Sequence, residues 1–404
     1  MHDTSMRRVA PGTRVVLVAP YLDRPGHYST FPRDLAHGFE SCGARVEVLH
    51  PAPLASDTVS LRTRCALDEL LQVGSWSGKL ARRFSHDPVK LSLLWLATQP
   101  RTHRPALVYW TDVGIADPGA TWWLSLAAWF GLTPNTAFTE HFTYSWSGHR
   151  VARWLKLDRL RLHRLHMFVH SRSLLDQVRQ VMGWQHAGRY VPWGLQPSFQ
   201  QQQDRDTARA RLSISPTERV LLIFGMQAIE RKAIDRLALA ISGMTLTRPL
   251  TLLFAGSRVD DRAHPFTTPG LSAHPNLNCR FIDSYIDEAS IPGYFAASDA
   301  VWCNYGRFNG ALGVLAQTIA MGRMALCSDY GESATLCQQY QLGLQSPADD
   351  IPALQACLSR FVDLPADAQA RFERAACRAA GEMTWDHFAR EVVHHTLPNA
   401  MTTN

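Results

Sequence analysis

The chain has 404 residues, of which 46% are hydrophobic and 19% charged, and it carries a formal net charge of +6. These values are typical of a soluble globular protein with large apolar cores, exclude a disordered chain, and allow two domains of ordinary size. The positive charge belongs to the first half. Residues 1–195 carry 23 Lys and Arg against 14 Asp and Glu, whereas residues 196–404 carry 18 against 21. We therefore expect an anionic partner on the N-terminal half: a lipid surface, a phosphate-bearing acceptor or, least favoured because no nucleic-acid module is recognisable, a nucleic acid.

Neither a metal site nor a membrane span is predicted. The eight cysteines form no Cys-x-x-Cys pair, so we expect reduced thiols in a cytosolic protein. No apolar segment of roughly 7–15 residues follows Arg7 and Arg8, which argues against a signal peptide. The most apolar window, Trp122 to Leu132, is shorter than the roughly 20 residues that cross a bilayer, and we expect a buried helix there.

The first half predicts a doubly wound parallel sheet. An apolar strand, Arg14 to Ala19, is followed by a Pro/Gly loop and by a helix from about Phe31 to Cys42, the usual opening of such a sheet. The loop contains Gly26 but no G-x-G-x-x-G, so the NAD fingerprint is absent. Further strands are predicted at 45–49, 106–110, 135–139, 167–170 and 189–191.

Residues 50–105 are predicted to be helical and amphipathic in patches. They carry a basic run, Lys79, Arg82, Arg83 and Lys90. This run is either a solvated helix face or a surface for an acceptor or a membrane.

The second half predicts another doubly wound α/β domain. The segment Pro192 to Pro197 indicates a hinge, and we expect domains at 1–195 and 196–380. A C-terminal helix within 381–404 is expected to pack back on the first domain. Two such domains that face each other leave a cleft beyond the carboxyl ends of their strands, where ligands bind. The strands are predicted at about 219–224, 250–254, 279–282, 300–304 and 324–328, and terminal helices at 365–380 and 384–395.

The stretch from Ala300 to Ser328 indicates strand, glycine-rich loop, helix and strand. Three glycines lie at 306, 310 and 313, and apolar residues then recur at helical spacing up to Gly322. Free backbone N–H groups and the positive end of the helix dipole would bind phosphate oxygens at such a loop. The alternative is a plain βαβ unit in which the glycines only permit close packing.

The second half resembles the GT-B glycosyltransferases, in particular the large nucleotide-sugar-dependent "group 1" family. The resemblance covers most of residues 165–395 and extends only loosely to the N-terminal domain. It implies two Rossmann-like domains that face each other across a donor-binding cleft. The motifs that carry it follow in the family's order: Tyr190–Leu195, Phe224-Gly225 with Arg231-Lys232, Leu253–Gly256, Phe281–Tyr285, Ala297–Ala300, residues 305–322, Ser328–Gly331 and Trp385.

The family's two signature glutamates, which have seven residues between them, align with amides here. Asn309 takes the place of the glutamate near the sugar, and Gln317 that of the ribose-binding glutamate. Amides can still bind sugar and ribose hydroxyls, but they cannot stabilise a positively charged transition state or take up a proton. Glu332 is the nearest acidic residue downstream.

The resemblance also implies roles for several residues around the donor. The family's phosphate-binding arginine aligns with Met226, which leaves Lys232, with Arg231 beside it, to bind the diphosphate. The backbone amides of Gly310, Ala311, Leu312 and Gly313 would share that task. The alternative for Lys232 is a solvated surface lysine.

Three further residues match family positions, each with a structural alternative. His141, at a strand end, would face the donor sugar or organise the acceptor, or else cap the strand. Gly26 would let a loop approach the donor phosphates, or be an ordinary turn glycine. Tyr285 would stack on the nucleotide base, or be a core tyrosine.

The leading hypothesis is a metal-independent glycosyltransferase. It would move a sugar from a nucleotide diphosphate sugar to a glycan or lipid-linked acceptor, with retention of configuration, in polysaccharide or glycolipid assembly. It would need no resident cofactor, and it would act in the cytoplasm or at the inner face of the membrane. The alternatives are an inactive nucleotide-sugar-binding scaffold subunit and a GT-B-shaped epimerase, for which the sequence offers few acid/base residues.

Overall fold

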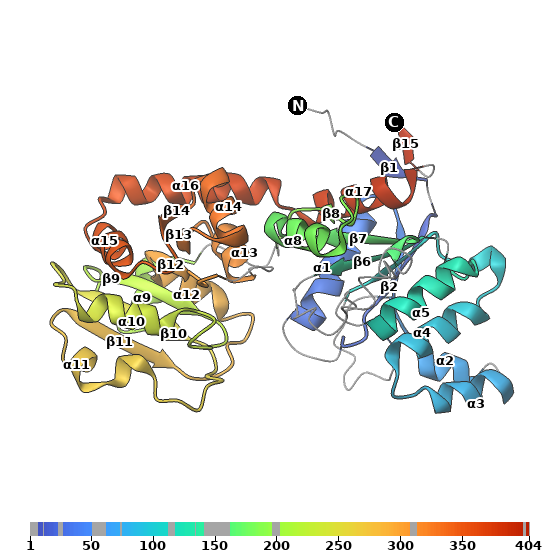
Figure 1. Cartoon of the computed structure of the whole chain (residues 1–404), viewed down its shortest axis with the longest axis horizontal. Coiled ribbons are helices and arrows are strands. Elements are labelled where there is room, and N and C mark those ends of the chain that lie inside the picture. Colours follow the sequence, from blue (N-terminus) through green and yellow to red (C-terminus); the bar gives the residue numbers. More distant parts are fainter. Residues whose placement is uncertain are drawn as a thin grey trace. The chain divides into compact units, whose positions relative to one another are not determined.

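The computed structural model describes residues 7–10, 12–22, 27–50, 62–72, 75–111, 118–133, 135–140, 162–195, 203–307, 313–398 and 401–403. The chain forms two compact units, one made of Met1–Gly194 with Thr384–Asn404 and the other of Leu195–Met383. Each unit contains a parallel sheet with helices packed on it (Figure 1). The α/β class with two doubly wound domains is thereby confirmed.

The first unit has a seven-stranded sheet in the order β4-β3-β2-β5-β6-β7-β8, with every neighbouring pair parallel. The central strands β2 and β5 are almost wholly apolar because both faces of the sheet are covered. In register, Val15 lies beside Val46 on one side and beside Leu107 on the other. The strands are β2 (Arg14–Val18), β3 (Arg45–His50), β4 (Thr63–Cys65), β5 (Leu107–Trp110), β6 (Thr136–Glu140), β7 (Leu165–Val169) and β8 (Arg189–Tyr190).

Two separate apolar clusters cover the faces of this sheet. One cluster joins the sheet to α2 (Ala66–Gln72), α3 (Ser75–Arg83), α4 (Pro88–Thr98), α5 (Pro118–Trp129) and α8 (Arg172–Met182). The other joins it to α1 (His27–Ser41) and to α17 (Trp385–Thr396), which comes from the far end of the chain. A short antiparallel pair, β1 (Arg7–Val9) and β15 (Met401–Thr403), also brings the two ends of the chain together.

α1 and α17 cross so closely that a glycine is required at the crossing. A Cβ atom built on Gly38 would lie 2.5 Å from the carbonyl oxygen of Trp385. A Cβ atom on Gly194 would lie 2.2 Å from the indole ring of the same tryptophan. Trp385 also packs edge-on against Phe31, with ring centroids 5.3 Å apart. The C-terminal helix is therefore a fitted part of the first unit's core.

The second unit has a six-stranded parallel sheet in the order β11-β10-β9-β12-β13-β14. α10, α11 and α15 share one apolar cluster with this sheet. Its strands are β9 (Arg219–Phe224), β10 (Leu250–Ala255), β11 (Leu277–Ile282), β12 (Ala300–Cys303), β13 (Met324–Ser328) and β14 (Gly343–Ser346). Its helices are α9 (Arg205–Arg211), α10 (Ile234–Ser242), α11 (Pro269–Ser272), α12 (Ile291–Ala297), α13 (Gly313–Ala320), α14 (Gly331–Tyr340), α15 (Ile351–Val362) and α16 (Ala366–Glu382).

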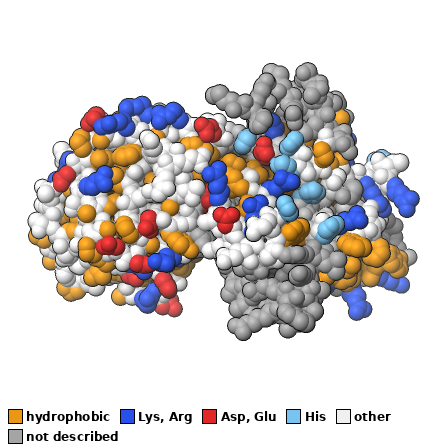
Figure 2. All heavy atoms as spheres, turned by 45° about the horizontal axis from the view of Figure 1, so that its top comes forward, with side chains coloured by type: hydrophobic (Ala, Val, Ile, Leu, Met, Phe, Trp, Pro, Cys, Tyr) orange, Lys and Arg blue, Asp and Glu red, His pale blue; other side chains and the backbone are white. Residues whose placement is uncertain are grey.

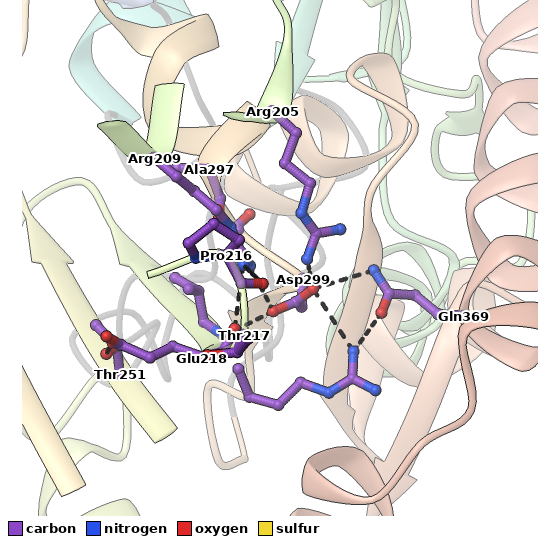
Figure 3. A network of polar contacts seen from close by, with 12 residues as sticks. Arg205, Arg209, Pro216, Thr217, Glu218, Thr251, Ala297, Asp299 and Gln369 are labelled. Carbon is purple, nitrogen blue, oxygen red and sulfur yellow. Dashed lines mark hydrogen bonds and ion pairs between the residues drawn. The ribbon is translucent and has the colours of Figure 1, made fainter. Parts of the chain in front are cut away.

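A buried carboxylate ties the amino-terminal edge of this second sheet together (Figure 3). Asp299 is fully buried and accepts hydrogen bonds from Arg209 Nη2 at 2.8 Å and from the backbone N–H of Val220 at 2.7 Å. Arg205 also donates to it, and Arg219 pairs with it at 3.6 Å. Asp299 therefore joins α9, β9 and the residue before β12 at the edge opposite the glycine-rich loop.

Within residues 50–105, the described part is helical in patches as expected, and the polar segment Thr63–Cys65 adds an edge strand that pairs with β3. One expectation is wrong. The apolar window 122–132 is not a buried helix: α5 buries only one face against the sheet, and Trp129 and Phe130 are 56% and 76% exposed. A helix that covers a sheet has a solvent face whatever its residues are.

Candidate functional site

The strand order of the second sheet creates a crevice between the loops that follow β9 and β12. From β9 the chain builds outward through β10 and β11, then returns to the other side of β9 for β12, β13 and β14. Ligands of open parallel sheets bind at the carboxyl ends of the strands where the order reverses in this way. The two loops here contain Arg231 and Lys232 after β9, and residues 304–312 after β12. The predicted donor residues thus belong to the loops that the topology favours for a ligand.

Lys232 is a buried lysine that connects these two loops. Its side chain is 3% exposed, and its Nζ donates a hydrogen bond to the carbonyl oxygen of Phe224, the last residue of β9. The same Nζ lies 5.4 Å from the centre of the Tyr305 ring. Burial lowers the pKa of Lys232 to about 8. Lys232 is therefore not a solvated surface lysine.

Bare backbone lines the carboxyl ends of β9 and β10. Gly225 and Gly256 have φ angles of +82° and +140°. A Cβ atom on Gly256 would lie 2.3 Å from the carbonyl oxygen of Gly225, so no other residue fits there. A Cβ atom on Gly225 would come 3.8 Å from Val314 in the first turn of α13. The start of α13 therefore lies directly beside the end of β9.

A pocket of about 580 Å³ opens beside the first residues of the glycine-rich loop. Arg231 and Gly306 both line it, so the structure brings the predicted cation and the predicted loop together. Arg236 and Arg307 line it as well, and both pair with Asp349, whose pKa they lower through hydrogen bonds. The lining therefore contains three arginines, and it also contains three carboxylates, Glu230, Asp235 and Asp260.

A smaller pocket of about 80 Å³ lies at the carboxyl ends of β10 and β11. Gln227 donates from Nε2 to the carbonyl oxygens of Ile223 and Gly225, both at 2.9 Å, while its buried Oε1 has no partner among the described residues. His264 accepts from the backbone N–H of Phe266 through Nδ1, which places the proton of the neutral ring on Nε2. Burial, together with Arg258, lowers the pKa of His264 to about 4, so the ring is neutral at pH 7.

Sequence reasoning missed both Gln227 and His264. Within the described part of the chain, His264 Nε2 has no hydrogen-bond partner either, so the small pocket holds one orphan donor and one orphan acceptor. Nothing in the sequence separates His264 from the other sixteen histidines. Gln227 follows the strand-end Gly225 by two residues, and no local pattern distinguishes it either.

Some of the remaining predicted residues lie within the described ranges and others lie outside them. Tyr285 is 63% exposed between β11 and α12, so it is not a core tyrosine, and its stacking on a base stays a prediction. Gly313 is the first residue of α13 and Gln317 lies one turn later. Glu332 is buried in the first turn of α14, where the next residue, Ser333, donates to Cys303 at the end of β12. Outside the described residues lie Gly26, His141, Asn309, Gly310, Ala311 and Leu312.

The described ranges contain neither a metal-binding cluster nor a membrane-spanning helix. There, no three His, Cys, Asp or Glu side chains gather closely enough to hold a metal ion. None of the helices in those ranges has the length and hydropathy that crossing a membrane requires.

The chain as a whole matches solved structures, although no protein-family model and no curated protein matches its sequence. Sucrose-phosphate synthase from Thermosynechococcus elongatus has a TM-score of 0.64 at 16% identity, over 95% of this chain and 98% of that one. HepE from Anabaena, solved in complex with UDP, has a TM-score of 0.66 at 12% identity, over 95% and 99%. WaaG, a glycosyltransferase involved in lipopolysaccharide biosynthesis, has a TM-score of 0.60 at 14% identity, over 95% and 99%.

These likenesses establish the fold, which is the GT-B fold that the order of the motifs implied.

Proposed function

We propose that the chain is a glycosyltransferase that uses a nucleotide diphosphate sugar as donor. The observation that carries the proposal is the crevice between the loops after β9 and β12. It combines Lys232 and Arg231, the bare backbone at Gly225 and Gly256, and the start of α13. A departing diphosphate needs cations and N–H donors, and this crevice offers both.

Within this proposal each donor residue has one task. Arg231 and Lys232 bind the diphosphate together with the amides of residues 310–313, and Gln317 binds the ribose. Tyr285 stacks on the base, for which its exposed ring is available. HepE has been solved with UDP, with UDP and glucose, and with UDP-glucose, so uridine donors are the first to test.

The residues proposed for the sugar come from both units: Gly26 and His141 belong to the first unit, and Asn309 to the second. His141 and Asn309 contact the sugar, Gly26 allows a loop to approach the phosphates, and the sugar is transferred with retention of configuration. We further propose a glycan or lipid-linked acceptor, polysaccharide or glycolipid assembly, a cytoplasmic location at the inner face of the membrane, and no metal requirement.

A second candidate, an inactive nucleotide-sugar-binding subunit, is favoured by one observation. The Nζ of Lys232 already donates to Phe224 and is buried under Tyr305. If that contact persists when nucleotide is present, the protein has lost Lys232 as a diphosphate cation along with its two carboxylates.

Calorimetric titration with UDP, GDP and UDP-glucose, followed by a nucleotide-release assay with candidate acceptors, separates these functions. Lys232→Met should weaken nucleotide binding by about 1.5–3 kcal/mol, roughly 10-fold to 150-fold, the range for a hydrogen bond to a charged group. Arg371→Met, which removes an exposed cation from α16, is the matched control and should bind normally. EDTA should change neither binding nor release.

Binding with release supports the transferase, and binding without release for any acceptor supports the scaffold subunit. Failure of all three nucleotides to bind would overturn both.

A further inference from the structure

The large apolar side chains that the described residues leave exposed are concentrated on α2–α5. Eleven such side chains are exposed, and six of them lie in this one region of the first unit: Leu71, Trp76, Trp123, Leu126, Trp129 and Phe130. In Figure 2, hydrophobic side chains gather at the right of the view, within the same unit, with Lys and Arg side chains at their border. Apolar groupings of this kind on a soluble surface indicate an interaction site.

α5 has two apolar faces rather than one. Its inner face, which includes Leu124 and Ala127, is buried against the sheet. Its outer face follows the spacing of Trp123, Leu126 and Phe130, three and four residues apart, and these side chains are 46%, 41% and 76% exposed. Water is a poor solvent for three such neighbours, so the outer face is suited to a second apolar environment.

Cations surround this outer face. Lys90 Nζ lies 5.7 Å from the ring centre of Trp123, and the guanidinium of Arg164 lies 5.6 Å from that of Trp129. Arg104 donates to the carbonyl oxygen of Gly131, just past the end of the helix, at 2.7 Å. The nearby carboxylate of Asp87 is paired with Lys90 at 2.6 Å.

The charged border continues onto α3. Lys90 Nζ also lies 5.8 Å from the ring centre of Phe84, which directly follows Arg82 and Arg83. Both arginines are exposed, as are Lys79 and Trp76, one and two turns earlier on the same helix. We define the aromatic-basic surface as Trp76, Lys79, Arg82, Arg83, Lys90, Trp123, Leu126, Trp129, Phe130 and Arg164. It spans three helices, α3, α4 and α5.

We propose that the aromatic-basic surface docks the protein onto an anionic lipid bilayer. Aromatic rings that can enter the boundary between headgroups and acyl chains, bordered by Lys and Arg that attract anionic headgroups, are the features of an interfacial membrane site. A dimer formed through this surface would instead place the Lys and Arg side chains of one copy against those of the other, and like charges repel. The proposal deepens the membrane partner of the proposed function by assigning it to a particular face.

The test is flotation of the intact protein with vesicles of phosphatidylglycerol and phosphatidylcholine, and with vesicles of phosphatidylcholine alone, in the absence of nucleotide. The protein should bind the anionic vesicles, and binding should weaken at high salt. Trp129→Ser combined with Phe130→Ser should weaken it about tenfold or more, because both rings leave the bilayer boundary. Arg82→Glu combined with Arg83→Glu should do the same on anionic vesicles only.

The matched control is Leu239→Ser, which removes a side chain that is 59% exposed on α10 of the other unit and should leave vesicle binding unchanged. Circular dichroism checks that each variant is folded. Equal flotation of the protein and the double aromatic variant would overturn the proposal. So would a dimer, seen without lipid by sedimentation velocity, that Phe130→Ser abolishes. Because no nucleotide is present, failure here is distinct from failure of sugar transfer.

Discussion

Replacing Asp299 by asparagine removes one negative charge from the interior of the second unit and changes little else in shape. The side chain is fully buried, and Arg209, one of its partners, is 1% exposed. Burial lowers the pKa of Arg209, and the carboxylate of Asp299 opposes that shift. With asparagine in place, the guanidinium stays buried with only neutral acceptors: the carbonyl oxygens of Ala297, Ser215, Pro216 and Glu218.

The expected cost follows from this geometry. Removing one partner of a buried ion pair destabilises a protein by about 3–5 kcal/mol, since the other charge remains without compensation. For a unit of this size each kcal/mol lowers the melting temperature by about 2–4 °C, so the expected drop is roughly 6–20 °C. Asp367→Asn is the matched control, because Asp367 is 77% exposed and pairs with Arg371 within α16. Its loss should cost only about 0.3–0.5 kcal/mol.

The assay can report on the second unit alone. Trp302 is the only tryptophan between residues 195 and 383, and it is 1% exposed. In protein labelled with 5-fluorotryptophan, the fluorine resonance of Trp302 therefore follows urea unfolding of this unit. If Asp299→Asn shifts this transition no more than Asp367→Asn does, the carboxylate does not hold the edge of the sheet together and the reasoning is wrong.

Three further predictions concern single positions. Gly38→Ala should destabilise the first unit by about 1–3 kcal/mol in urea titrations, because the new Cβ meets the backbone of α17. The control is Gly381→Ala, which has nothing within 4 Å of its Cβ and should be neutral or stabilising by up to about 1 kcal/mol. Equal effects of the two substitutions would contradict this prediction. Folding lowers the pKa of Lys232 from 10.5 to about 8, so between these values the unfolded chain binds more protons and the free energy of unfolding rises with pH. Lys232→Met should remove that rise. If the free energy of unfolding depends on pH in the same way with and without the substitution, this explanation is wrong. Gly256→Ala should abolish nucleotide binding measured by calorimetry, because its Cβ would lie 2.3 Å from the oxygen of Gly225; normal affinity would show that this turn does not matter.

The parts of the fold that sequence predicted are those where one signal dominates. A strand covered on both faces, such as Arg219–Phe224, is a continuous apolar run and stands out against its flanking loops. Thr63–Cys65 and Arg7–Val9 are polar and only three residues long, so their pairing is decided by tertiary contacts that no local pattern records. The exposure of the outer face of α5 was not predicted, because an apolar sequence does not show which of its residues are buried and which are exposed to solvent.

The candidate site, like the fold, has features that the sequence could predict and features that it could not. Arg231 and Lys232 could be found because they follow a strand that ends in glycine, within a recognisable order of motifs. The burial of Lys232 under Tyr305 could not, because it depends on the meeting of two loops about seventy residues apart. His264 and Gln227 come together in the same way, from segments with no pattern of their own.

The packing of α17 on α1 has a consequence for how the protein is made. Phe31 and Phe39 emerge from the ribosome early, yet they share a core with Phe388 and Val392, which are synthesised only after the whole of Leu195–Met383. The intervening unit can thus finish folding first, while the nascent N-terminal portion waits with an uncovered apolar face. Chaperone occupancy during translation should therefore be highest on the earliest residues, and a stop codon just before Trp385 should yield aggregates in spite of an intact second unit.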